Sequence, residues 1–127
     1  MINTRKSILY IDDEEINLRV FKNTFRRDYT IFTARSAKDG MKILENQSID
    51  LIITDQRMPD ITGVQFLSMV QEKYPEIPPG RLIISGYSDY EDIEMAYKKY
   101  KLFQFIAKPW DQNELKIIIQ KAIANDA

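Results

Sequence analysis

The sequence predicts an α/β fold in which helices cover both faces of a parallel sheet. Short apolar runs alternate with segments of helical periodicity, and no repeat or low-complexity linker interrupts the alternation. This order is typical of βα units with parallel strands. The length of 127 residues is enough for one hydrophobic core. We therefore expect a single domain over residues 1–127.

Five apolar runs predict the strands. They cover residues 8–11, 29–33, 51–54, 81–85 and 103–106. Each run is short and rich in isoleucine, leucine, threonine or aromatic residues, as buried strands commonly are.

Apolar residues three or four positions apart predict a helix after each run. The groups are Leu18, Phe21 and Phe25; Ala37, Met41 and Leu44; Gly63, Leu67 and Val70; Ile93, Ala96, Tyr97 and Tyr100; and Leu115, Ile118, Ile119 and Ala122. Capping residues mark several helix starts, namely Ser36, Thr62, Ser88 and Asp111.

Composition excludes several classes of function. With 18 basic and 19 acidic residues, the net charge of -1 is not that of a nucleic-acid-binding surface. No apolar stretch approaches the roughly 20 residues that cross a bilayer, and residues 1–6 do not resemble a signal peptide, so we expect a cytoplasmic protein without membrane contact. The chain has no histidine, which excludes His-based metal sites, Ser-His-Asp catalysis and a phosphohistidine of its own.

Functional groups follow four of the five predicted strands. They are Asp12 and Asp13, then Asp55, then Ser85 with Gly86, and finally Lys108 with Pro109. Parallel α/β sheets bind ligands beyond the carboxyl ends of their strands. Carboxylates on adjacent strands about 4.8 Å apart would repel one another, so a divalent cation is the simplest explanation of the acids.

These motifs, in this order and together with Met58-Pro59 and Gly63, resemble the receiver domains of two-component response regulators. The resemblance extends from Ile8 to about Ala124. It implies a flavodoxin-like (βα)5 three-layer sandwich with a five-stranded parallel sheet in the order 2-1-3-4-5. It also implies a phosphorylation-activated switch in a phosphorelay, rather than an enzyme with ordinary turnover.

The resemblance assigns roles to the acids and the lysine. Asp55 matches the phosphoryl acceptor, and Asp13 matches a direct Mg²⁺ (or Mn²⁺) ligand. Asp12 would hold the metal directly or through water, and the backbone carbonyl of Arg57 would complete the protein ligands. Lys108 would pair with Asp55 at rest and with a phosphoryl oxygen afterwards. Carboxylates also suit the oxygen ligation that Mg²⁺ requires.

Further residues match the conformational switch. Ser85 would donate its hydroxyl to the new phosphoryl oxygen, and Phe105 matches the aromatic residue that then moves inward. Phe103 is expected on the same sheet face and is the alternative. Arg57 and Tyr87 flank the expected path of the hydrolytic water, and their bulk predicts slow self-dephosphorylation.

Partners also follow from the resemblance. The phosphoryl donor would be a sensor histidine kinase or a phosphotransfer protein, docking near Ile16, Asn17 and Val20. The output would be a further domain or a partner protein. The resemblance also implies a homodimer through the fourth helix, fifth strand and fifth helix, with Ile117 exposed on that face.

Three alternatives remain open at this point. A haloacid-dehalogenase-like phosphatase also uses an aspartate and Mg²⁺, but its Asp-x-Asp pattern is replaced here by Asp12-Asp13-Glu14. A flavin or nucleotide site would need a Gly-rich loop after the first strand, which is missing. A degenerate receiver that acts only through contacts is disfavoured by the intact Asp13, Asp55 and Lys108. Taken singly, the acids could also be a helix cap and a turn former, and Ser85 and Lys108 ordinary surface residues.

Overall fold

The computed structural model of the chain describes residues 5–76, 80–86 and 90–124. Within these residues a single sheet holds five parallel strands in the order β2-β1-β3-β4-β5. The strands are β1 (Ser7–Ile11), β2 (Thr30–Ala34), β3 (Leu51–Thr54), β4 (Gly80–Ser85) and β5 (Gln104–Ala107). The predicted flavodoxin-like fold and strand order are confirmed.

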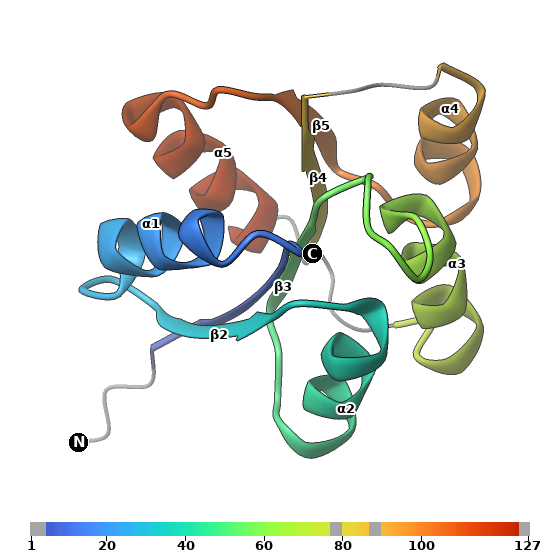
Figure 1. Cartoon of the computed structure of the whole chain (residues 1–127), viewed down its shortest axis with the longest axis horizontal. Helices are drawn as coiled ribbons and strands as arrows, with labels where there is room; N and C mark the ends of the chain where they lie inside the picture. Colours follow the sequence, from blue (N-terminus) through green and yellow to red (C-terminus); the bar gives the residue numbers. More distant parts are fainter. Residues whose placement is uncertain (1–4, 77–79, 87–89, 125–127) are drawn as a thin grey trace.

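Helices alternate with the strands and cover both faces of the sheet. They are α1 (Glu15–Phe25), α2 (Ala37–Asn46), α3 (Gly63–Lys73), α4 (Tyr90–Lys99) and α5 (Gln112–Ala124). One face packs against α1 and α5, and the other against α2, α3 and α4 (Figure 1). Within the described part of the chain, every helix is too short or too polar to cross a membrane.

Each face of the sheet has its own apolar core, because alternate residues of each strand point to opposite faces. On β1, Leu9 and Ile11 join the cluster under α2, α3 and α4, whereas Ile8 and Tyr10 join the cluster under α1 and α5. All four side chains are fully buried. The central strands therefore have the continuous apolar character of a sheet that is covered on both faces.

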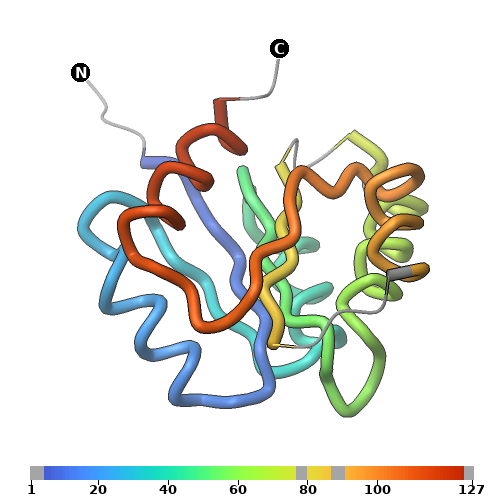
Figure 2. Tube along the Cα trace, turned by 90° about the horizontal axis from the view of Figure 1, so that it is seen from above, coloured from blue at the N-terminus to red at the C-terminus, as the bar shows by residue number. Residues whose placement is uncertain are grey.

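The strands run in one direction, so their carboxyl ends meet at one edge, the lower edge in Figure 2. The register pairs Ile11 with Thr54, and Thr54 with Ile83. Residues that follow β1 and β3 therefore start from the same level of the sheet. This register positions the functional site.

Local signals for helix starts are largely confirmed. The Ser36 side chain accepts a hydrogen bond from Asp39 N–H, and Thr62 forms a capping box with Gln65. Asp111 accepts a hydrogen bond from Glu114 N–H at 2.9 Å. Ser88 lies outside the described residues.

Phe103 differs from its prediction. It was expected within the last strand and on the same face as Phe105, but β5 begins at Gln104. Phe103 packs against the cluster under α1 and α5, whereas Phe105 packs against the opposite one. The expectation is wrong because two-residue alternation holds only inside a strand.

Candidate functional site

Three carboxylates converge where β1 and β3 end. Asp12 and Asp13 follow β1, and Asp55 follows β3. Each offers an oxygen, and these three oxygens lie within 4.8 Å of one another. Asp12 and Asp55 are buried, at 0% and 5% exposure, while Asp13 is half-buried. The structure thus brings together the acids that the sequence singled out.

Lys108 joins two of these acids from the end of β5. Its ammonium group lies 3.1 Å from Asp12 Oδ2 and 3.2 Å from Asp55 Oδ2. Its backbone N–H donates to the carbonyl of Ser85 at 3.0 Å. Burial lowers the pKa of Lys108, but the hydrogen bonds and charges of Asp12 and Asp55 outweigh it and leave the pKa above its ordinary value. The lysine is a fixed cation between the acids.

Asp12 is held by four donors. Its Oδ2 accepts hydrogen bonds from Tyr10 Oη at 2.9 Å, Asn17 Nδ2 at 3.2 Å and Lys108 Nζ at 3.1 Å. Its Oδ1 accepts one from Glu14 N–H at 3.0 Å. The last bond forms a local turn before α1. The helix cap is Glu14, and no side chain accepts a cap hydrogen bond there, so Asp12 is not the cap of α1.

The loop after β3 holds Asp55 in place. Asp55 Oδ1 accepts a hydrogen bond from Gln56 N–H at 2.7 Å. The Gln56 side chain in turn accepts one from Val64 N–H at 2.9 Å, at the start of α3. Gly63 lies so close that a Cβ there would be 2.3 Å from the Asp55 carbonyl oxygen. Only glycine allows this approach, which fixes the loop that carries the acid.

Further predicted residues line the same pocket, a hollow of about 440 Å³. Its lining residues are Asp13, Glu14, Asp55, Arg57, Ser85, Gly86 and Lys108. Ser85 is buried at the end of β4, and Arg57 is exposed. Tyr87 lies outside the described residues.

The donor set fits a hard divalent cation. Its side-chain ligands are carboxylate oxygens, which Mg²⁺ prefers, and the pocket is open to solvent molecules that would complete an octahedron. Lys108 offsets only one of the three negative charges. Such a pocket can hold an anionic group between a lysine and a metal ion, next to a carboxylate that can act as a nucleophile.

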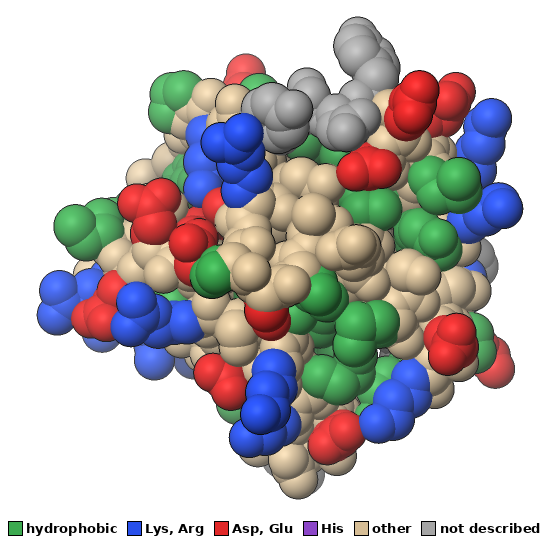
Figure 3. All heavy atoms as spheres, turned by 45° about the vertical axis from the view of Figure 1, so that its right-hand side comes forward, with side chains coloured by type: hydrophobic (Ala, Val, Ile, Leu, Met, Phe, Trp, Pro, Cys, Tyr) green, Lys and Arg blue, Asp and Glu red, His purple; other side chains and the backbone are tan. Residues whose placement is uncertain are grey.

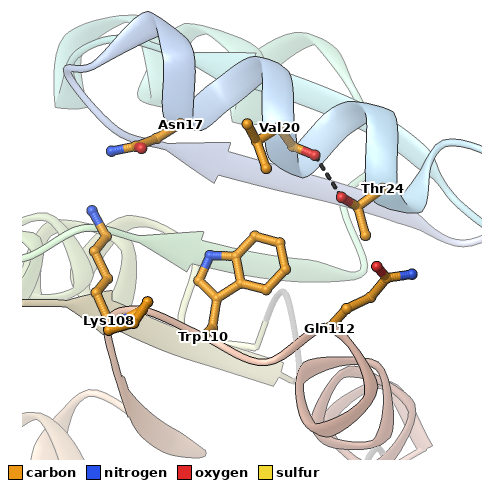
Figure 4. Close-up of a pocket in the computed structure, with 7 residues that line it drawn as sticks. Asn17, Val20, Thr24, Lys108, Trp110 and Gln112 are labelled. Carbon is orange, nitrogen blue, oxygen red and sulfur yellow. Dashed lines mark hydrogen bonds between the residues drawn. The ribbon is translucent and has the colours of Figure 1, made fainter.

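Among the further hollows that the described residues form, two are lined by residues from more than one helix. One, of about 450 Å³, lies between α1 and the start of α5, where Asn17, Val20 and Thr24 face Lys108, Trp110 and Gln112 (Figure 4). The other, of about 400 Å³, lies between α2 and α3 and includes Met41, Ile61 and Met69. On the side of the molecule that carries α3 and α4, apolar side chains lie among charged ones (Figure 3).

Comparison with known proteins agrees with this geometry. The sequence profile described as "Response regulator receiver domain" matches residues 8–120. The chain belongs to the response regulator receiver domain family. Receiver domains of this family are phosphoacceptor switches and bind Mg²⁺ through an acidic pocket. No observation supports the phosphatase alternative.

Two similar proteins are transcriptional regulators. The receiver domain is 35% identical over 123 residues to the hydrogenase transcriptional regulatory protein HoxA of Cupriavidus necator, covering 97% of this chain and 25% of HoxA. It is 28% identical to the DNA-binding transcriptional regulator NtrC of Proteus hauseri, with 95% and 25% covered. The chain therefore spans about a quarter of the length of these relatives.

Solved structures share the fold over nearly the whole chain. The signal receiver domain of an HD domain-containing protein from Pseudomonas fluorescens Pf-5 superposes with a TM-score of 0.90 at 26% identity, covering 97% of this chain and 98% of that one. A response regulator receiver domain from Clostridium thermocellum gives 0.84 at 32% identity, with 94% of each covered.

Sequence reasoning missed two contributors to the receiver site. The sequence predicts Tyr10 only as a residue of the first strand, whereas the structure shows its hydroxyl donating to Asp12, which lies just beyond the end of β1. The sequence does not indicate a role for Gln56, because that role depends on a hydrogen bond from Val64 N–H, eight residues further along the chain. Asn17 was expected near the site, but as a docking residue rather than a donor to Asp12.

Proposed function

We propose that this receiver domain accepts a phosphoryl group on Asp55. The observation that carries the proposal is the position of this carboxylate, buried between the Asp12/Asp13 pair and the ammonium group of Lys108. An Asp55 oxygen would attack phosphorus as the phosphorus–nitrogen bond of a partner's phosphohistidine breaks, and the leaving imidazole would take up a proton. These 127 residues include no histidine, so the donor would lie outside them, on a histidine kinase or phosphotransfer protein.

Asp13 and Asp55, with the carbonyl of Arg57, would hold Mg²⁺ or Mn²⁺, and Asp12 would assist. When bound, the metal offsets the repulsion between the attacking carboxylate and the phosphoryl oxygens. Lys108 would exchange its bond to Asp55 for one to a phosphoryl oxygen. The raised pKa of Lys108 beside Asp12 and Asp55 supports this role, because the side chain is charged before phosphorylation.

Ser85 and Phe105 would turn phosphorylation into a change of shape. Ser85 lines the pocket, and its hydroxyl would donate to the phosphoryl oxygen. Phe105 is half-buried against the core under α4, and its backbone N–H donates to Tyr97 Oη at 2.7 Å. This bond ties α4 to β5 and supports a coupling between the two elements.

The output would be a domain or partner outside the matched segment, as in the transcriptional regulators to which this chain is similar. The face of α4, β5 and α5 exposes Met95, Tyr97 and Ile117 at 40%, 45% and 51%. These apolar side chains support a homodimer through that face. Ile117→Lys should then abolish any dimer seen by analytical ultracentrifugation, whereas a dimer that persists would exclude this face.

Mg²⁺-dependent labelling by a small phosphodonor such as acetyl phosphate tests the acceptor. We expect label on the native chain and on Asp28→Asn, an exposed matched control, but not on Asp55→Asn. Equal labelling of Asp55→Asn would remove Asp55 as the acceptor. A native chain that takes no label with Mg²⁺ would favour a degenerate receiver acting through contacts.

The lifetime of the acyl phosphate tests the crowding of the pocket. Arg57 lines it, and we expect Arg57 and Tyr87 together to slow the attack of water on phosphorus. Replacing both with small residues should raise the rate of phosphate release. A rate equal to that of the native chain would show that these side chains do not limit hydrolysis.

A further inference from the structure

A groove between α2 and α3 is separate from the acidic pocket. It has a volume of about 400 Å³, and the two hollows share no lining residue. One wall is α2, where lining residues recur along one side from Ala37 to Glu45. The other wall includes Ile61, in the loop after β3, and Met69 on α3. At about 1.5 Å per residue the α2 wall is about 12 Å long, which is enough for two turns of a helix lying alongside it.

Bonds between the two walls join them at both ends of α2. At its start, Asp60 Oδ2 accepts a hydrogen bond from Ala37 N–H at 3.1 Å. Near its end, Lys73 Nζ lies 2.8 Å from Glu45 Oε2. The groove is therefore preformed, and a partner would bind it without first separating or ordering its walls.

The interior of the groove is apolar and adaptable. Met41 and Ile61 are half-buried and pack against the core under α2, α3 and α4, whereas Met69 is 45% exposed. Methionine side chains are unbranched and flexible, so they can fit the shape of different apolar partners. Figure 3 shows apolar side chains with basic ones beside them on the side of the molecule that carries α3. Such a groove suits the apolar face of an amphipathic helix.

The residues that line the groove leave two positive charges unpaired. Of the two acids, Glu45 is paired with Lys73, and the Asp60 carboxylate is bonded to the start of α2. Lys38 and Lys42 are exposed, and within the described part of the chain neither has a recorded ion pair. They are one helical turn apart on α2, so their ammonium groups lie along the same side of the groove. A complementary ligand would carry carboxylates with the same spacing.

We propose that the α2–α3 groove is a docking site for an acidic amphipathic helix of a partner protein. Apolar side chains of that helix, spaced by three or four residues, would lie between Met41 and Met69. Two carboxylates one turn apart would pair with Lys38 and Lys42 at the rim, where opposite charges fix the orientation of the helix. The site goes beyond the phosphoacceptor function, because it uses neither the acidic pocket nor the face of α4, β5 and α5.

Methyl NMR of the full chain, labelled at its methionine methyl groups, tests this docking site. The probes are a synthetic helical peptide with leucines on one face and glutamates along its flanks, and the same peptide with every glutamate replaced by lysine. We expect the acidic peptide to shift the Met41 and Met69 signals and to leave Met95, exposed on α4, unchanged. Its Kd should be about tenfold lower than that of the basic peptide, as expected for two exposed ion pairs. Equal shifts for Met95, or equal affinity of the two peptides, would contradict the proposal.

Charge reversal tests the role of the two lysines. The double variant Lys38→Glu/Lys42→Glu should reverse the preference, so that the basic peptide binds about tenfold more tightly than the acidic one. Lys116→Glu/Lys121→Glu, at exposed positions on α5, is the matched control and should keep the native preference. A preference for the acidic peptide that persists in Lys38→Glu/Lys42→Glu overturns the inference.

Met69→Gln removes an apolar contact without a change of charge, at a position exposed enough to leave the fold intact. It should raise the Kd of the acidic peptide about threefold, because part of a methionine side chain is then no longer buried against the helix. An unchanged Kd would show that the helix does not lie in the groove. If the native Met41 and Met69 signals move with protein concentration in the absence of peptide, the occupant is a second copy of this chain, and the proposal is wrong.

Discussion

The two ends of β4 both bury charge, but in different ways. At its start, the fully buried Arg81 donates to Gln71 Oε1 at 2.8 Å and to the carbonyls of Tyr100 and Tyr74, each at 3.1 Å. At its other end, Ser85 lies beside a site where Lys108 is shared between Asp12 and Asp55. Arg81 is bound to uncharged acceptors, two of which are backbone carbonyls, whereas Lys108 is bound to carboxylates.

The partners of Arg81 are permanent, whereas those of Lys108 can be exchanged. Tyr74 and Tyr100 lie at the carboxyl ends of α3 and α4, where carbonyl groups point outward and favour a cation. Burial lowers the pKa of Arg81 to about 10, which still leaves it charged at neutral pH. Backbone carbonyls cannot leave, whereas Lys108 can exchange a carboxylate for a phosphoryl oxygen. Stability is therefore concentrated at the first end and function at the second.

The largest effect is expected at the structural end. Arg81→Met keeps an apolar side chain of similar length but leaves buried acceptors without a donor, so it should lower the free energy of unfolding by about 3 kcal/mol. Urea denaturation measures this loss. Arg19→Met, at an exposed position on α1, should stay within about 0.5 kcal/mol of the native chain. If Arg81→Met also lowers the free energy of unfolding by only about 0.5 kcal/mol, Arg81 does not have this structural role.

Mg²⁺ binding should have the next largest effect on the free energy of unfolding. This effect should come only from the acidic site beside the carboxyl end of β4. At a free concentration one hundred times Kd, binding should raise the free energy of unfolding by about 2.7 kcal/mol. Urea denaturation with and without Mg²⁺ measures the increment. Arg81→Met should keep the full increment, because Gln71, Tyr74 and Tyr100, to which Arg81 donates, do not line the acidic pocket. An increment reduced in Arg81→Met would mean that the two ends are coupled.

The smallest effect is a gain in stability. Asp13 is half-buried beside two other carboxylates, so Asp13→Asn removes repulsion and should stabilise the metal-free chain by about 1 kcal/mol. The same variant should lose most of the Mg²⁺ increment. Asp39→Asn, on the exposed side of α2, is the control for the change of charge. If metal-free Asp13→Asn is less stable than the native chain, repulsion between the three carboxylates does not lower the stability of the native chain.

Much of the site could be predicted because parallel strands end at one edge. Asp12, Asp13, Asp55 and Lys108 follow strands that the apolar pattern predicts, and Ser85 is the last residue of such a strand. The sheet then brings them together. The burial of the Arg81 side chain could not be predicted in this way. Its burial depends on the ends of α3 and α4, which meet it from positions 7 and 19 residues away.

By itself, the sequence determined how strands and helices alternate along the chain. It also determined that both faces of the sheet are covered and that the acids lie at the edge where the strands end. These follow from local periodicity and from residues that stand directly after each strand. Tertiary structure decided how the hydrogen bonds are shared within the site: four for Asp12, two for Asp55, and none recorded for the Asp13 side chain among the described residues. That distribution depends on donors far away in the sequence, such as Lys108, 96 residues from Asp12. The spacing of residues in the sequence does not show which of them come within hydrogen-bond distance.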